Sequence, residues 1–250
     1  MKALVFCIIL IPAISFAKIK IAIIDSGISE QEWSNVNYSK GYNFVLNSNK
    51  FPKLQKGNDH GTFLVGVLAG FPELNNKLEI IPIQFANLEE EDQNYSSRSN
   101  YYKSLRYAID QKVDILSLSI VSHVDDPKER KLLEEAVKSG IKVFVASGNV
   151  EKKFEGVDPY PCSYNIKKVI CVGNIDKNKK IISNNIKEVD IYVQGALVSL
   201  GEGGELVFKD GSSMSTAILA HNYALFKLKK EKKFLKFLRN NKILYKRDKK

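Results

Sequence analysis

The chain carries the sequence Lys-Ile-Ala-Ile-Ile-Asp-Ser-Gly at residues 20–27, which is its clearest indication of fold class. Its unbroken apolar run predicts a strand buried on both faces, as in a parallel sheet. Asp25 follows the run directly, and Gly27 permits a sharp exit from the strand. Similar β-branched runs predict strands over Lys18–Ile24, Leu78–Ile83, Val113–Ser119, Ile141–Ala146, Lys168–Gly173 and Val189–Val193.

Helical periodicity fills the intervals between these runs. It predicts helices over Gly61–Ala69, Tyr101–Gln111 and Lys128–Ser139. This alternation of strands and helices favours an α/β fold, a doubly wound and mostly parallel sheet flanked by helices. No linker interrupts the pattern, so residues 18–226 are predicted to form one domain. In such a sheet, a site is expected at the carboxyl ends of the strands.

Composition excludes several classes of protein. The 250 residues are 44% apolar and 26% charged, unlike a fibre, a disordered tail or a disulfide-knotted miniprotein. The net charge of +10 is confined to residues 227–250, where twelve Lys and Arg residues face only Glu231 and Asp248. The predicted body is therefore neutral, with no signal for a specific nucleic-acid partner. This basic tail either packs against the body with its lysines in water or makes weak contact with anionic lipid or envelope polymer.

The first 17 residues have the pattern of a signal peptide. Lys2 precedes an apolar run, Ala3–Ile14, and small residues at Ser15 and Ala17 suit a cleavage site. The run is shorter than the roughly 20 residues that a spanning helix needs, and the alternative is a buried first strand. We therefore expect a mature chain that begins near Lys18 and is secreted, or located in the periplasm or cell envelope.

Two cysteines remain once Cys7 leaves with the signal peptide. Cys162 and Cys171 link a proline-rich loop to the predicted strand at 168–173. An even pair in an oxidising compartment favours a disulfide. Two buried thiols are the alternative.

Four polar elements lie where a catalytic site is expected, although each has an ordinary structural interpretation. Asp25 ends a strand, where a turn-forming Asp is common. His60 begins a helix, where a capping or structural His is equally expected. Ser213 lies at a helix start, where an N-cap Ser is usual. Asn149 follows a strand in a Gly-Asn turn.

Together these elements resemble the subtilase family. Ile23–Ile28 is similar to its aspartate motif, His60-Gly61-Thr62 to its histidine motif, and Gly211–Met214 to its Gly-Thr-Ser-Met serine motif. Val145–Asn149 resembles the segment that carries its oxyanion asparagine, and Val113–Ser119 resembles a strand that lines its cleft. The order Asp, His, Ser is the subtilisin order. The resemblance extends from Ile19 to Leu225.

The resemblance implies a secreted or envelope serine endopeptidase that works through an acyl-enzyme. Asp25 would orient His60, His60 would be the general base, and Ser213 would be the nucleophile. Asn149 and the Ser213 backbone N–H would bind the oxyanion. The implied cleft residues are Ser117, Leu118, Ser119, Ala146, Ser147 and Gly148. A protein or peptide substrate, a monomer and no cofactor are expected. No metal ligand set is predicted; a structural calcium ion, frequent in the family, has no clear ligand cluster here.

Several positions depart from the family pattern. Asp59 stands where glycine is usual before the histidine, and Ala217 stands where proline is usual after the serine. The usual Ser-Leu-Gly-Gly at the cleft is here Ser-Ile-Val-Ser, residues 119–122. Asp25 lies close to the expected mature start, which would leave no room for a pro-domain. These departures keep two alternatives open: a catalytically inactive subtilase-fold binding module, and an envelope-polymer binder that acts through the basic tail.

Overall fold

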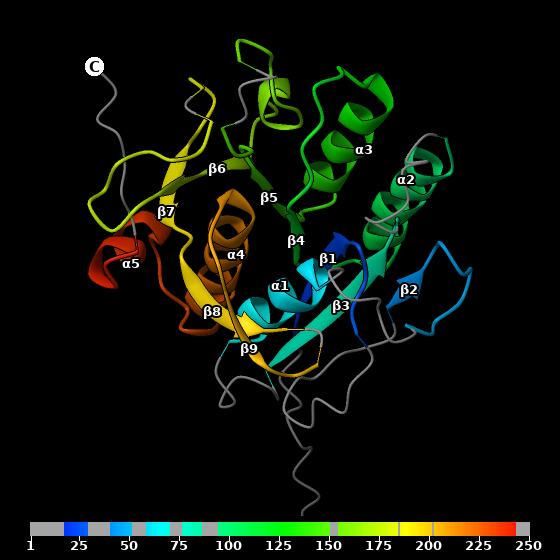
Figure 1. Cartoon of the computed structure of the whole chain (residues 1–250), viewed down its shortest axis with the longest axis horizontal. Helices are drawn as coiled ribbons and strands as arrows, with labels where there is room; N and C mark the ends of the chain where they lie inside the picture. Colours follow the sequence, from blue (N-terminus) through cyan, green and yellow to red (C-terminus); the bar gives the residue numbers. More distant parts are fainter. Residues whose placement is uncertain are drawn as a thin grey trace, which may run out of the picture.

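The structure is a computed structural model that describes residues 18–29, 41–51, 59–70, 77–86, 95–150, 155–184, 186–201 and 203–243. A parallel sheet of seven strands in the order β2-β3-β1-β4-β5-β6-β7 forms its centre (Figure 1). The α/β, doubly wound sheet predicted from the sequence is therefore confirmed. The expected signal peptide, residues 1–17, lies outside the described residues.

The strands of this sheet are β1 (Ile19–Asp25), β2 (Tyr42–Asn43), β3 (Leu78–Gln84), β4 (Ile115–Leu118), β5 (Lys142–Ala146), β6 (Val169–Ile175) and β7 (Ile191–Gln194). A separate antiparallel hairpin pairs β8 (Leu197–Leu200) with β9 (Leu206–Lys209). The helices are α1 (His60–Ala69), α2 (Tyr95–Asp110), α3 (Pro127–Lys138), α4 (Ser212–Leu228) and α5 (Phe234–Asn240), with a short 3₁₀ turn at Cys162–Tyr164.

Helices cover both faces of the sheet, and alternate residues of each strand supply the two cores. In β1, Ile21 and Ile23 pack on the side of α1 and α4, whereas Ala22 and Ile24 pack on the side of α2 and α3. All four side chains are at most 2% exposed. The unbroken apolar run at the start of the chain thus serves two cores at once.

The chain order makes β1 the turning point of the sheet. β3 lies on one side of β1 and β4 on the other, so the strand order reverses there. Crevices at such switch points are where ligands bind in open α/β sheets. Asp25 is the last residue of β1 and therefore lies at this position.

The β8–β9 hairpin lies over α1 (Figure 1), and its two faces differ. Ser199 on the inner face donates a hydrogen bond to the Phe63 carbonyl at 2.9 Å. On the outer face, Val198, Leu206 and Phe208 are 54%, 73% and 67% exposed. The sequence patterns described above did not reveal this hairpin, because its strands are short and only one face is buried.

The basic segment from residue 227 onward begins inside α4 and includes α5. Phe237 and Leu238 of α5 are buried in the core that α1 and α4 share. Phe234 packs against Phe226 of α4, with ring centroids 5.2 Å apart. This part of the segment therefore packs against the body, and its lysines are exposed.

Candidate active site

Asp25 and His60 meet at the carboxyl end of β1. The His60 Nδ1 lies 2.9 and 3.1 Å from the two carboxylate oxygens of Asp25. The Asp25 side chain is 6% exposed, and the Ser26 backbone N–H and hydroxyl also donate to it at 2.8 and 3.1 Å. A Cβ at Gly61 would lie 2.0 Å from the Gly27 carbonyl oxygen, so this glycine lets α1 approach β1 closely.

The environment of His60 favours its charged form. Burial alone would lower the pKa of the ring, but the Asp25 carboxylate and its hydrogen bond outweigh burial and raise the pKa above the ordinary 6.5. Lys209 lowers this pKa and Asp59 raises it, in smaller measure. Since Asp25 occupies Nδ1, the other ring nitrogen, Nε2, is the one that can take a proton from a nucleophile.

Ser213 lies in the first turn of α4, as the sequence predicts for a serine at a helix start. Gly211 immediately before this helix has a φ of +143°, a conformation that L side chains rarely adopt, which accounts for the glycine there. The Ser119 hydroxyl donates to the Ser213 carbonyl at 3.2 Å. Unpaired backbone N–H groups at the start of a helix favour negative charge, and Ser213 lies among them.

Asn149 is held beside the same helix start. Its side-chain oxygen accepts the Ser212 backbone N–H at 3.0 Å. This contact fixes the orientation of the amide and leaves its NH₂ group as a donor for a ligand. The pairing suits an oxyanion donor.

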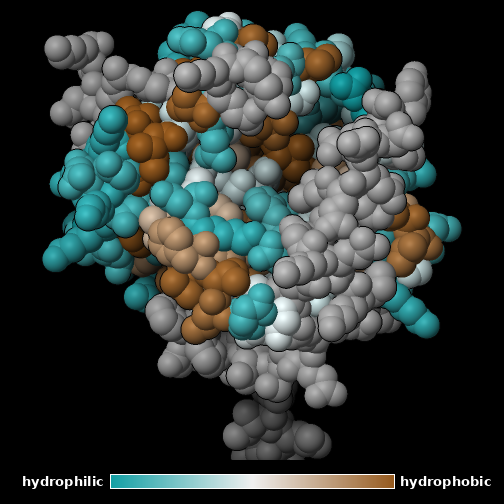
Figure 2. Space-filling view, in the orientation of Figure 1, coloured by the Kyte–Doolittle hydropathy of each residue, from teal (hydrophilic) through white to brown (hydrophobic). Residues whose placement is uncertain are grey.

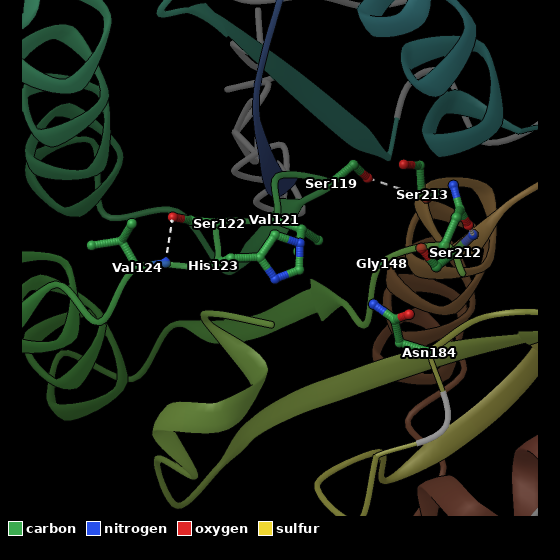
Figure 3. A pocket seen from close by; sticks show the side chains of 10 residues that line it. Ser119, Val121, Ser122, His123, Val124, Gly148, Asn184, Ser212 and Ser213 are labelled. Atoms are coloured by element: carbon green, nitrogen blue, oxygen red, sulfur yellow. Dashed lines mark hydrogen bonds between the residues drawn. The ribbon is translucent and has the colours of Figure 1, made fainter. Parts of the chain in front are cut away.

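A pocket of ≈ 470 Å³ opens beside Ser213 (Figure 3). Asn149, Gly148 and Ser119 contribute to its lining, and Figure 3 shows the Ser119 side chain directed toward Ser213. The other lining residues are Val121, Ser122, His123, Val124, Asn184 and Ser212. The pocket therefore extends from Ser213 to Asn149.

Of the six predicted cleft residues, four do not line this pocket. Ser117, Leu118, Ala146 and Ser147 are buried to 1% exposure or less and do not line the pocket. The first three belong to β4 and β5, whose two faces are both covered by helices. Only Ser119 and Gly148, just beyond these strands, are among the lining residues.

Residues 121–124 and Asn184 line the pocket but were not predicted. For residues 121–124, the departure from the family pattern at 119–122 could have indicated a role in the pocket. Val121 adds a side chain at a position where the family has glycine. His123 looked like a loop histidine, and no motif marked Asn184. Asn184 reaches the pocket because its side chain donates to the Ser147 carbonyl at 3.0 Å.

The pocket-lining segment at Ser122 is hydrogen-bonded to the segment at Tyr160. Ser122 and Tyr160 exchange two backbone hydrogen bonds, at 2.9 and 2.7 Å. Cys162, two residues after Tyr160, is joined to Cys171 by a disulfide. The cysteine pair singled out in the sequence thus ties the segment at Tyr160 to β6.

The described residues contain neither a group of metal-ligating side chains nor a membrane-spanning helix. No three His, Cys, Asp or Glu side chains there gather closely enough to hold a metal ion. No described helix is long and apolar enough to cross a membrane.

His221, buried in α4, has a structural role. Its Nδ1 hydrogen-bonds to the Leu68 carbonyl at 2.9 Å, and burial lowers the pKa of its ring.

Three features together define the subtilisin-like class of α/β proteins. They are a parallel sheet, a hydrogen-bonded Asp–His pair at its switch point, and a serine at the start of a helix beside it. A model of the subtilase family (Peptidase_S8) matches residues 17–243. The chain belongs to this family of serine proteases.

Individual relatives agree with this placement. An "Intracellular serine protease" of Paenibacillus polymyxa is 30% identical over 218 residues, which are 84% of this chain and 66% of that protein. The "Major intracellular serine protease" of Bacillus subtilis is 27% identical and matches 90% of this chain and 73% of its own length. Subtilisin E of Bacillus subtilis is 26% identical over 84% of this chain, which spans only 55% of that relative.

A solved structure supports the fold alone. The crystal structure of MycP1 with its N-terminal propeptide removed matches 85% of this chain and 78% of its own, with a TM-score of 0.68 and 19% identity. The subtilisin-like architecture predicted from the sequence is therefore shown.

Proposed function

We infer that this chain is a serine endopeptidase that cleaves protein substrates through Asp25, His60 and Ser213. The observation that carries the proposal is the Asp25–His60 hydrogen bond of 2.9 Å at the switch point of the sheet. Membership of the chain in the subtilase family supports peptide-bond hydrolysis, and the pocket beside Ser213 supplies room for a substrate side chain.

The proposed reaction has two halves. In the first, His60 Nε2 takes the Ser213 proton while the hydroxyl oxygen attacks the substrate carbonyl, and Asp25 stabilises the resulting imidazolium. The oxyanion accepts hydrogen bonds from the Asn149 NH₂ and the Ser213 backbone N–H. The proton then passes to the leaving amine, which gives an acyl-enzyme. In the second half, His60 activates water in the same way, and the acyl-enzyme is hydrolysed.

The direct test is labelling with a fluorophosphonate. Such a probe reacts with an activated serine, so the wild-type protein should be labelled and Ser213→Ala should not. Ser139→Ala is the control, because it removes an exposed hydroxyl that does not line the pocket and should leave labelling intact. Equal labelling of the Ser213→Ala protein would refute the assignment.

One observation favours a second candidate, an inactive binding module. Among the described residues, His60 hydrogen-bonds to Asp25, but no hydrogen bond joins its ring to the Ser213 hydroxyl. Hydrogen bonds between nucleophile and base are often loose in structures without substrate, so the enzyme remains the main proposal. A folded wild-type protein that resists the phosphonate would favour the binding module.

Two further proposals concern location and attachment. The signal-peptide pattern at residues 1–17 supports export, with cleavage near Ala17. The exposed Lys232 and Lys233 before α5 and Lys236 within it support weak, salt-sensitive contact with anionic lipid or envelope polymer, because the buried side of this helix holds it on the body. Figure 2 shows a hydrophilic surface on the side of the molecule where α5 lies in Figure 1.

A further inference from the structure

An ion pair links the segment of His60 to the segment of Ser213. The Lys209 Nζ donates to the Asp59 carboxylate at 2.6 Å, across 150 positions of sequence. Asp59 directly precedes His60, and Lys209 ends β9, four residues before Ser213. The pair therefore joins two backbone segments that carry the proposed base and nucleophile.

The ion pair is partly shielded from water. The side chains of Lys209 and Asp59 are 27% and 16% exposed. The Lys209 Nζ also lies 5.8 Å from the ring centroid of Phe63, one turn further along α1. A surface ion pair in open water contributes little, but one partly covered and placed over an aromatic ring holds its geometry better.

A second contact makes the connection rigid. β8 is fixed to the same helix through the Ser199–Phe63 hydrogen bond of 2.9 Å. A Cβ at Gly66 would lie 2.3 Å from the Ser199 hydroxyl, so the hairpin and α1 are in close contact. The hairpin thus meets α1 near its middle through β8 and at its start through β9.

The capping geometry shows that Asp59 has a role other than the usual one at a helix start. Asp59 occupies the N-cap position of α1, yet its side chain makes no capping hydrogen bond. In α3, by contrast, the N-cap Asp126 accepts the backbone N–H groups of Lys128 and Glu129. The Asp59 carboxylate is directed to Lys209 instead.

We propose that the Asp59–Lys209 pair is a clamp that positions His60 against Ser213. This inference rests on the proposed function. Asp59 and Lys209 are positioning residues, because they act through the segments that they join. The clamp sets how closely the base approaches the nucleophile, and a misplacement of about 1 Å at such a contact costs about 10²-fold in rate.

The charges of the pair also act on His60, in opposite directions. Lys209 lowers the His60 pKa and Asp59 raises it, alongside the larger effects of burial and Asp25. Removing one charge leaves the effect of the other on the His60 pKa unopposed. The acid limb of the plot of kcat/KM against pH should therefore move to lower pH in Asp59→Asn and to higher pH in Lys209→Met.

The test is a double-mutant cycle on the full chain. Asp59→Asn, Lys209→Met and the double variant are compared in kcat, in KM and in the rate of phosphonate labelling, each measured above the acid limb. We expect each single variant to lose about 10-fold or more in labelling rate and kcat, with KM nearly unchanged. The double variant should lose no more than either single one, because both break the same contact. Lys209→Arg should retain most of the rate.

Lys227→Met is the matched control. It breaks an ion pair of the same length, 2.6 Å, between α4 and Asp114, away from the proposed site. It should leave kcat and the labelling rate unchanged. Melting temperatures identify any variant that fails to fold. If Asp59→Asn fails, the comparison of Lys209→Arg with Lys209→Met decides; if Lys209→Met fails, the comparison of Asp59→Asn with the wild type decides.

The outcomes separate the clamp from the proposed function. If the wild type reacts with the phosphonate and the single variants keep its kcat and labelling rate, with only the acid limb of the pH profile moved, the clamp is refuted. The proposed function is then unaffected. Additive losses in the double variant also overturn the clamp. A wild type that is folded and unreactive overturns the proposed function, and the clamp with it.

Discussion

At the residue scale, two carboxylates beside His60 have different tasks. Asp25 is buried at the end of β1 and holds Nδ1, so it fixes the ring and favours the imidazolium. Asp59 is directed away, to Lys209. Although the two side chains flank the same histidine, only Asp25 is placed to fix the tautomer.

The raised pKa of His60 predicts a particular acid limb. Because the neutral ring is the base, kcat/KM should fall as pH drops through a pKa above 6.5. Asp25→Asn removes the carboxylate while burial remains, so its acid limb should move to lower pH. Its kcat should fall by about 10⁴, as in serine proteases that lose this aspartate. Rate profiles of both proteins from pH 4 to pH 9, about the range of His titration, check this.

Stability should follow the same linkage. A raised histidine pKa stabilises the fold fully below the unfolded value of 6.5, and this contribution is lost as pH rises through the folded pKa. Denaturant midpoints of Ser213→Ala should therefore decline across that window more than those of Ser213→Ala combined with Asp25→Asn. Parallel curves for the two proteins would contradict the attribution to Asp25.

Residue patterns predicted some of the site better than the rest. Asp25 and His60 lie together because motifs of fixed spacing place them at a strand end and a helix start. No motif predicted the residues that line the pocket. Val121 and His123 line it from a loop after β4, whereas Ser117 and Leu118 are buried in the sheet and do not line it. Which side of a strand end faces the opening depends on helix packing over the sheet, which the local sequence does not specify.

At the element scale, the wall of the pocket depends on elements behind it. Glu129 of α3 is 4% exposed, and Tyr101 of α2 and Tyr164 of the 3₁₀ turn donate to it, both at 2.6 Å. Burial raises the pKa of Glu129, against the opposing effect of these hydroxyls. Through Tyr164, this cluster connects α2 and α3 to the turn that begins at Cys162.

Loss of the disulfide should therefore affect both stability and substrate binding. Cys162→Ser combined with Cys171→Ser should lower the free energy of unfolding by about 2–3 kcal/mol, as expected for so short a loop. Because the loosened segment carries Tyr160, which pairs with Ser122, KM should rise more than kcat falls. Urea unfolding and peptide kinetics measure the two effects. Two alkylated cysteines in exported wild-type protein, prepared without reductant, would show that no bridge forms.

At the scale of the whole molecule, the sheet was predictable and the additions to it were not. Long apolar runs indicated β1 and β3 to within a residue, since burial on both faces leaves little ambiguity. The two-residue β2 and the β8–β9 hairpin are too short and too exposed to give such a signal. The basic composition of residues 227–250 gave no clear helix signal for α5, which packs on the body through Phe234, Phe237 and Leu238.

The basic segment should thus have two separable roles, one structural and one electrostatic. Removing Lys229–Lys250 exposes the surface that Phe237 and Leu238 cover, and full burial of such side chains contributes about 1.5–3 kcal/mol each. Truncation should therefore lower the melting temperature. Changing the exposed Lys232, Lys233 and Lys236 to Gln leaves the buried side of α5 intact and should leave the melting temperature unchanged.

Vesicle binding distinguishes the electrostatic role. The wild type should bind vesicles that contain anionic lipid at low salt and release them at physiological salt, where charges are screened within about 8 Å. The triple Gln variant should bind more weakly, because each basic residue near such a surface contributes about 1 kcal/mol. Neutral vesicles are the control and should bind neither protein. If the triple variant binds anionic vesicles as well as the wild type, these three lysines are only a solvated surface, and attachment through them is excluded.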